Sequence, residues 1–214
     1  MITTKLSKSS VLALLAAGMA AAPAAAQSLE TACPAPVGRI ASVEGGVERR
    51  IADGSWRAAR TEEPLCAGDM VRTGKYSRAA IALANDSVLR LDQETTLQVG
   101  AVPAEEPSVL DLVKGIIQVF SHRPRSLSID TPFVNASVEG TEFLVLAEAD
   151  RAAVTVFDGK VRASNAQGAV LLAAAGTAEA RAGAAPVQGV AVRPRDAAHW
   201  TLHYQPIVTE VSAA

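Results

Sequence analysis

The chain has 214 residues, of which 49% are hydrophobic and 20% are charged, and its formal net charge is −2. This length fits one domain, or one domain with an extension. The acidic balance and the lack of any long run of like charge argue against nucleic-acid binding and against a basic arm for lipid headgroups.

The N-terminal residues 1–26 predict a cleavable signal peptide. A short segment with two lysines precedes an apolar stretch at 11–22, and the alanines at 24–26 supply the small residues that signal peptidase recognises. The alternative is a membrane anchor, but a spanning helix needs about 20 apolar residues, and Pro23 ends this shorter run. We therefore expect a bacterial protein that is periplasmic or secreted and does not span the membrane after cleavage.

Two cysteines, Cys33 and Cys66, follow the predicted signal. In an oxidising exported compartment, two cysteines most simply form one disulfide. The alternative for Cys33 is a lipoprotein cysteine, which would have to follow the cleavage site directly behind a lipobox. Residues 30–32 do not provide one. We expect the disulfide, which would tie the N-terminal segment 27–36 to the turn before Gly68 and Asp69.

From residue 37 onward, apolar residues alternate with polar ones in short runs that Gly, Asp and Asn interrupt. This pattern is typical of half-buried strands separated by turns. Trp56 is expected at the core or its rim. In chain order we expect a bent strand or hairpin around 45–46, a turn at 53–54, and strands over 70–74, 80–84, 88–91 and 97–99.

The second half continues the pattern. Two hairpins are predicted, one around the glycine of 114–115 and one around Asp158-Gly159, since Asp-Gly suits a type I′ turn. Further strands are expected over 127–129, 143–146 and 170–172, and after 176–177. Many short strands at intervals of about 8–12 residues predict an all-β domain over 37–188. Its short antiparallel strands would be stacked in a sandwich or a solenoid-like arrangement.

The C-terminal extension, 189–214, has a different character. Prolines bracket residues 196–204, which are expected to form a short helical segment. Trp200 and Tyr204 would share one side of it at a spacing of four. They either pack onto the β domain or contact another protein. His199 and His203 share the same spacing, but no third ligand in register supports a metal site.

The rest of the sequence offers no catalytic set. No Ser-His-Asp or Cys-His arrangement stands in a recognisable context, and no glycine-rich phosphate loop occurs. We therefore expect a protein that is not an enzyme, with no cofactor and no bound metal.

Several segments between 67 and 161 together resemble the FecR family, in that family's order. The segments are 68–74, 77–79, 89–91, 112–115, 131–136, 138–143 and 156–161. The motif residues, interpreted as structural, are Gly68, Asp69, Arg72, Thr73, Gly74, Thr131, Pro132, Gly140, Thr141, Asp158 and Gly159.

The resemblance implies an all-β periplasmic domain. In the best-known members this domain senses the state of a TonB-dependent outer-membrane receptor and passes it to a sigma factor. Those members carry a cytoplasmic anti-sigma segment and a membrane helix before the domain, where this chain has a predicted signal peptide. Residues 194–206 resemble the junction at which longer FecR-domain proteins continue into tetratricopeptide repeats. We expect either a stand-alone version or a truncated relative.

These features together predict a non-enzymatic periplasmic binding or sensing protein. Its partner is expected to be another envelope protein, bound in envelope signalling. The alternative is a module that binds cell-wall glycan or polysaccharide, although only four Trp and Tyr residues are present to stack on sugars.

Overall fold

The computed structural model describes residues 33, 35–51, 54–101, 107–121, 123, 127–138 and 142–189. All of them belong to one compact unit, Ala32–Ala214. All the secondary-structure elements that these residues form are strands, which confirms the all-β prediction. The predicted signal peptide and the predicted helical segment at 196–204 lie outside the described residues. Across these described ranges, no helix is long and apolar enough to cross a membrane.

The strands form two sheets, here called sheet A and sheet B. In spatial order, sheet A contains β4 (Pro64–Leu65), β1 (Gly38–Glu44), β6 (Arg78–Leu83), β7 (Val88–Leu91), β9 (Ser108–Phe120), β12 (Glu142–Ala147), β13 (Arg151–Asp158), β16 (Thr177–Arg181) and β17 (Val187–Gly189). Sheet B contains β3 (Arg57–Ala58), β2 (Val47–Arg50), β5 (Met70–Thr73), β8 (Thr96–Val99), β9 again, β10 (Leu127–Asp130), β11 (Asn135–Val138), β14 (Lys160–Asn165) and β15 (Gly168–Ala173).

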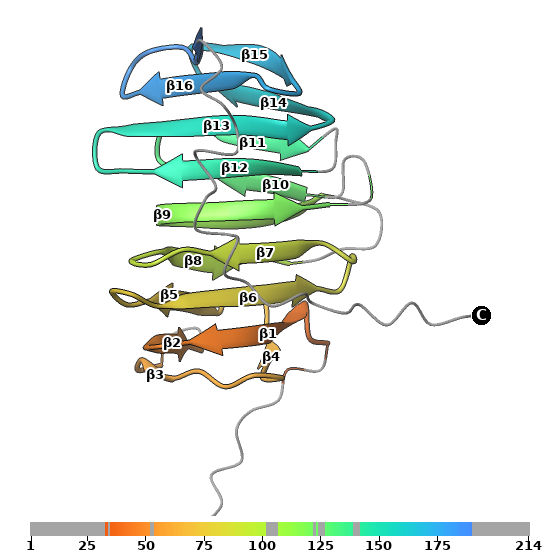
Figure 1. The fold of residues 1–214 in the computed structure, drawn as a ribbon, viewed down its shortest axis with the longest axis vertical. Coiled ribbons are helices and arrows are strands. Elements are labelled where there is room, and N and C mark those ends of the chain that lie inside the picture. Colours follow the sequence, from red (N-terminus) through yellow and green to blue (C-terminus); the bar gives the residue numbers. More distant parts are fainter. Residues whose placement is uncertain are drawn as a thin grey trace, which may run out of the picture. The chain divides into compact units, whose positions relative to one another are not determined.

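The two sheets lie back to back, and their strands are stacked in nearly the same order along the chain (Figure 1). Neighbouring strands are antiparallel, with one exception: β9 and β10 run parallel. This arrangement agrees with the predicted stack of short antiparallel strands. Because the chain steps repeatedly from one sheet to the other, successive strands add to one end of the stack.

The hydrophobic core fills the space between the two sheets. Period-two alternation turns every second side chain inward, and the largest fully buried ones are aliphatic or, in one case, phenylalanine. Sheet A contributes Ile40, Ile81, Leu89, Leu91, Ile117 and Phe143, and sheet B contributes Leu97, Leu110, Leu112, Leu127 and Ile129. The alternation seen in the sequence therefore reports the core face of each strand.

Strand β9 belongs to both sheets because it bends at Gly115. Its first part pairs with β8 and β10 in sheet B, and its second part pairs with β7 and β12 in sheet A. The inward positions change from even numbers (Leu110 and Leu112) to odd numbers (Ile117 and Val119) across this bend. A register shift opposite Thr96 accommodates the extra residue, as in a β-bulge.

Replacing Gly115 by alanine is expected to destabilise the protein by at least about 2 kcal/mol, since a residue forced into a strained conformation costs about 1–3 kcal/mol before any clash. Gly115 has φ +100°, and an added Cβ would lie 2.4 Å from the Cα of Thr95. Urea unfolding followed by fluorescence measures the loss. Gly68→Ala is the matched control, because Gly68 also has a positive φ of +89° but has open space around it. Equal losses in the two variants would contradict the role of the close approach to Thr95.

The two predicted hairpins are wrong, for one shared reason. Residues 109–120 form the single bent strand β9, and β13 and β14, on either side of Gly159, lie in different sheets and pair with other strands. Gly159 does have the expected positive φ, +81°. Glycine permits the turn, but at both places the turn passes from one sheet to the other instead of folding a strand onto its neighbour.

Candidate functional site

Among the residues of the predicted motif, Asp69 occupies the most unusual environment, because its carboxylate is buried. It follows Gly68 in the turn directly before β5, where the Gly68 amide donates to the Val99 carbonyl at 2.7 Å. The side chain of Asp69 is only 1% exposed. A buried carboxylate requires a charged or hydrogen-bonding partner, and here the partner is an arginine from β2.

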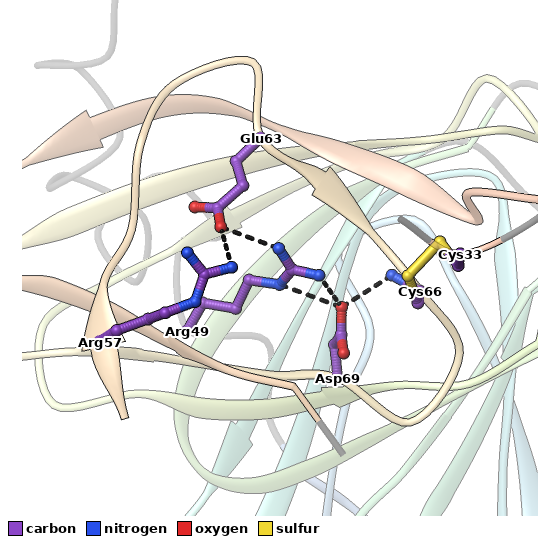
Figure 2. The surroundings of a disulfide bond; sticks show 6 residues. All are labelled: Cys33, Arg49, Arg57, Glu63, Cys66 and Asp69. Atoms are coloured by element: carbon purple, nitrogen blue, oxygen red, sulfur yellow. Dashed lines mark hydrogen bonds and ion pairs between the residues drawn. A yellow bond between two sulfur atoms is a disulfide. The ribbon is translucent and has the colours of Figure 1, made fainter. Parts of the chain in front are cut away.

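Arg49 lies between two acidic side chains in the interior (Figure 2). Its Nη2 and Nε bond to Asp69 Oδ2 at 2.6 and 3.0 Å, and its Nη1 bonds to Glu63 Oε1 at 2.8 Å. Arg57 Nη2 also lies 2.7 Å from Glu63 Oε1. The guanidinium fork suits two carboxylates at once. We call these four residues the buried charge cluster.

The cluster changes the acidity of its members. Burial favours the neutral form of Glu63, but the hydrogen bonds from the Arg60 amide and from Arg49, with the charge of Arg57, outweigh it and lower the pKa of Glu63 below its ordinary 4.5. Burial likewise opposes the charge of Arg49, yet the two acids raise the Arg49 pKa above its ordinary value. The ionised forms are therefore the stable ones in the folded protein.

The disulfide lies directly beside the buried charge cluster. Cys33 and Cys66 are joined, as the sequence predicts, with their Cα atoms 5.8 Å apart. The Cys66 amide donates to Asp69 Oδ2 at 2.8 Å, so Asp69 connects the disulfide to Arg49 (Figure 2). The disulfide and the buried ion pairs therefore both stabilise the turn that contains Cys66 and Asp69.

The remaining N-terminal motif residues hold turns in place. The Thr95 amide donates to the Thr73 hydroxyl at 3.0 Å, and the Gly74 amide donates to the Gly46 carbonyl at 2.8 Å. A Cβ at Gly74 would lie 3.2 Å from that carbonyl oxygen. These contacts join β5 to the turns beside it, which supports a structural role for both residues.

The motif residues between β10 and β11 form a closed turn. The Thr131 hydroxyl accepts from the Val134 amide at 2.9 Å, and Pro132 and Phe133 lie between these two residues in the chain. Thr131 thus fixes the turn locally, as short hydroxyl side chains commonly do.

The structure brings only some of the predicted residues together. Asp69 lies in the buried charge cluster, Arg72 is on the outer surface of sheet B, and Asp158 ends β13 in sheet A. Thr131 and Pro132 belong to a separate turn. Gly140, Thr141, Trp200 and Tyr204 lie outside the described residues.

The outer face of sheet B carries an arginine–tryptophan surface that the sequence analysis did not identify. The guanidinium carbon of Arg72 lies 4.1 Å from the centre of the Trp56 ring, and that of Arg50 lies 5.2 Å from it. Glu48 Oε2 accepts from Arg72 Nε at 2.6 Å. Since Arg49 and Val71 point into the core, their neighbours on the strands point outward. We call Glu48, Arg50, Trp56 and Arg72 the Arg–Trp surface.

Two open grooves lie on other parts of the described surface. One, of about 780 Å³, is lined by β1, the β6–β7 turn and the Pro64 region. The other, of about 380 Å³, lies between the β10–β11 turn, the β14–β15 turn and Arg181. Asp130 lines this second groove, and burial together with the nearby charge of Asp111 raises its pKa. Within the described residues, no group of three His, Cys, Asp or Glu side chains could hold a metal ion.

Arg49, Glu63 and Trp56 are the residues whose roles sequence reasoning missed. For Arg49 a signal existed, because alternation from Val47 places residue 49 on the same inward face. An arginine at an inward position requires acidic partners. The identity of those partners depends on contacts 14 and 20 residues away in the chain, which the local pattern does not contain.

A family model described as FecR protein matches residues 69–162. Two crystal structures of a candidate anti-sigma factor from Parabacteroides distasonis ATCC 8503, at 1.65 and 2.50 Å resolution, each match with a TM-score of 0.56 and 15% identity. The matches cover 63% of this chain and 65% and 64% of those chains, respectively, which is less than two thirds of their length. This likeness shows a shared fold. The comparison with curated proteins finds no match.

The family match begins at Asp69, in the buried charge cluster, and ends at Arg162 in β14. It thus covers the crossing strand β9 and parts of both sheets, while Arg49 and Trp56 precede it. Residues 69–162 therefore carry a FecR domain, in agreement with the resemblance seen in the sequence.

Proposed function

We propose that the chain is an exported, non-enzymatic protein that binds another protein of the bacterial envelope in a signalling role. The FecR domain at 69–162 is the observation that carries this proposal. The fold shared with a candidate anti-sigma factor supports a regulatory role. The disulfide supports an oxidising compartment, and hence the periplasm.

Export and domain organisation form part of the same proposal. Residues 1–26 would be removed as a signal peptide, 27–36 would be anchored by Cys33, 37–188 would form the β domain, and 189–214 would extend from it. N-terminal sequencing of the protein recovered from periplasm tests the first boundary. A mature protein that retains the residues before 27 would contradict it.

We further propose that the Arg–Trp surface contacts the partner. Tryptophan and arginine dominate the energetics of many protein interfaces, because they combine a large contact area with specific polar contacts. Here Trp56 is partly exposed and is positioned by Arg50 and Arg72 on the regular strands β2 and β5. Ordering these side chains before binding reduces the entropic cost of association.

The same geometry argues against the glycan-binding alternative. Sugars stack on an open aromatic face, whereas the guanidinium groups of Arg72 and Arg50 lie over the ring of Trp56. Sedimentation with peptidoglycan and binding to glycan arrays are expected to give no signal.

The experiment is capture of partners from periplasm by the immobilised protein, from cells grown in iron-replete and iron-poor media. We expect at least one reproducible partner, and we expect Trp56→Ala and Arg72→Ala to reduce its capture. Arg162→Ala is the matched control, because Arg162 is an exposed arginine on β14 in the same sheet but far along the stack. Failure to capture any partner in either medium would refute the binding role. Equal capture by all variants would refute the assignment of the surface alone.

A further inference from the structure

Two sheet edges end together at the end of the stack that contains β15 and β16 (Figure 1). Beyond β9, sheet B continues through β10, β11 and β14 to β15, and sheet A continues through β12, β13 and β16 to β17. Among the described strands, β15 pairs only with β14, and β17 pairs only with β16. This end therefore has two edges, about 10 Å apart as in any pair of packed sheets.

Both terminal strands are uncharged and largely apolar. Strand β15 reads GAVLLA and strand β17 reads VQG. Leu171 on β15 is 51% exposed and Val187 on β17 is 66% exposed. Proteins commonly protect an exposed sheet edge with a charge, a proline, a β-bulge or a very short strand. Strand β15 has six residues, none of them charged or proline, and its register with β14 is regular.

The opposite end of the stack is protected in the usual way. Its last strands, β3 and β4, have two residues each and include Arg57 and Pro64. Edges this short offer little backbone for pairing with another chain. The end with β15 and β17 is therefore the end at which both sheets can continue into a partner.

The hairpin of β14 and β15 determines how a partner strand can pair. A two-residue loop joins these strands, and Asn165 lies opposite Gly168 at its base. The pair at the base of such a loop is hydrogen-bonded, and bonded and non-bonded pairs alternate along an antiparallel ladder. Ala169 and Leu171 belong to the non-bonded pairs. Their N–H and C=O groups therefore point away from β14, toward the open side.

A second copy of the chain offers what these edges require. A partner for both sheets must present two edges at the spacing of two packed sheets, and the same end of another molecule does so. At a two-fold interface each group meets its own counterpart, so a charged edge would face its own charge, and these strands carry none. Antiparallel pairing centred on Leu171 places Leu171 opposite Leu171 and Ala169 opposite Ala173. Gly168, which lies against Ala185, stays outside this pairing.

The size of the contact indicates a weak dimer. A strand of six residues is about 20 Å long, and two packed sheets with their outer side chains are about 25 Å thick. The interface would therefore bury about 500 Å² per chain, or about 1,000 Å² in total, which is below the ~1,200–2,000 Å² of stable complexes. We expect the dimer to dissociate in the micromolar range.

We propose that two copies of the chain pair through this end, with β15 antiparallel to β15 and the two β17 edges adjacent, so that both sheets continue across a two-fold axis. The Arg–Trp surface lies on β2, β5 and the segment before β3, toward the other end of the stack (Figure 1). The dimer does not depend on the envelope partner proposed above, so either proposal can fail without the other.

Sedimentation velocity of the intact chain, from low micromolar to several hundred micromolar concentration, tests the dimer. We expect a reversible equilibrium between monomer and dimer. Leu171→Lys is expected to raise the dissociation constant at least about tenfold, because two like charges would meet at the axis. Val109→Lys is the matched control, since Val109 is 42% exposed in the same sheet but lies on β9, and this variant should dimerise like the wild type.

Two sedimentation results would overturn the proposal. One is a monomer at every concentration. The other is a series of assemblies larger than a dimer, because a head-to-tail contact does not close on itself.

Cross-linking locates the contact. In the proposed register the two Leu171 Cα atoms would lie about 5.5 Å apart, a separation that a disulfide spans. Leu171→Cys is therefore expected to form a covalent dimer on mild oxidation, whereas Val109→Cys is not. A dimer that Leu171→Lys does not weaken, or that Leu171→Cys does not cross-link, would use another surface and would also overturn the proposal.

Discussion

Replacing Arg49 by methionine is expected to lower the free energy of unfolding by about 3–5 kcal/mol, because removing one partner of a buried ion pair leaves uncompensated charge in the interior. Both Asp69 and Glu63 would lose their bonds to the guanidinium, and the side chains of Arg49 and Glu63 are only 4% and 8% exposed. Methionine preserves most of the apolar stem, so the loss measures the charge and its hydrogen bonds more than lost packing. Urea unfolding at pH 7, with the disulfide intact, gives the value.

The control for Arg49→Met is Arg39→Met. Arg39 pairs with Glu62 at 2.7 Å, about the same distance as the Arg49–Glu63 pair, but the two side chains are 40% and 67% exposed. Exposed pairs contribute about 0–1 kcal/mol, so this variant should remain close to the wild type. Similar losses of stability in both variants would show that burial does not determine how much the buried charge cluster contributes to the free energy of unfolding.

The pH dependence provides a second check on the same variant. The folded pKa of Glu63 is lowered, so its ionisation stabilises the folded state above the ordinary value of 4.5, and this contribution disappears as the pH falls through the lowered pKa. Arg49→Met removes part of the effect that lowers the pKa of Glu63. The difference in stability between wild type and variant is therefore expected to narrow as the pH is brought from 7 to below 4.5. A constant difference would contradict the assigned cause.

Removal of the disulfide is expected to lower the free energy of unfolding by about 3–4 kcal/mol. The disulfide restricts the conformations of the unfolded chain, and this stabilising effect grows with the length of the loop that it closes. Cys33 and Cys66 are separated by 33 residues in the chain. The double variant Cys33→Ser/Cys66→Ser and the wild type in the presence of reductant should lose similar amounts in urea unfolding. The disulfide sulfurs do not take part in the buried charge cluster, although the Cys66 amide bonds to Asp69.

That hydrogen bond allows a sharper test of the disulfide. Because Cys66 and Arg49 both bond to Asp69, their effects are expected to be non-additive, as is usual for residues in one network. Combining the cysteine substitutions with Arg49→Met should give a loss different from the sum of the separate losses. Combining them with Gly115→Ala, at the distant bend of β9, should give an additive loss. Additivity in both combinations would show that the disulfide and the cluster act independently.

The strands were predictable where local alternation reports one buried face. The segments at 88–91 and 97–99 appear as β7 and β8, and the apolar run at 143–146 lies within β12. In these segments burial and the period-two pattern have the same cause, the pleat of the strand. The class of fold follows from the number and spacing of such segments.

The pairing of the strands was not predictable in the same way. A glycine with positive φ permits a tight hairpin and an intersheet corner equally, and Gly115 and Gly159 both make corners. The choice depends on which distant strand offers the better packing, which is a long-range property. For the same reason the buried charge cluster escaped prediction. Arg49 has a local signal, but Glu63 and Asp69 become its partners only after β2 and β5 pair.

Strand β9 has a further consequence for how the protein opens. The strands before it, β1 to β8, and those after it, β10 to β17, form no paired ladder with one another in the described part. Each group pairs with β9 instead. A stack of this kind is held together between neighbours. We therefore expect the two groups to open as two units that share β9 as their boundary, and hydrogen exchange should show β9 as the last strand to exchange.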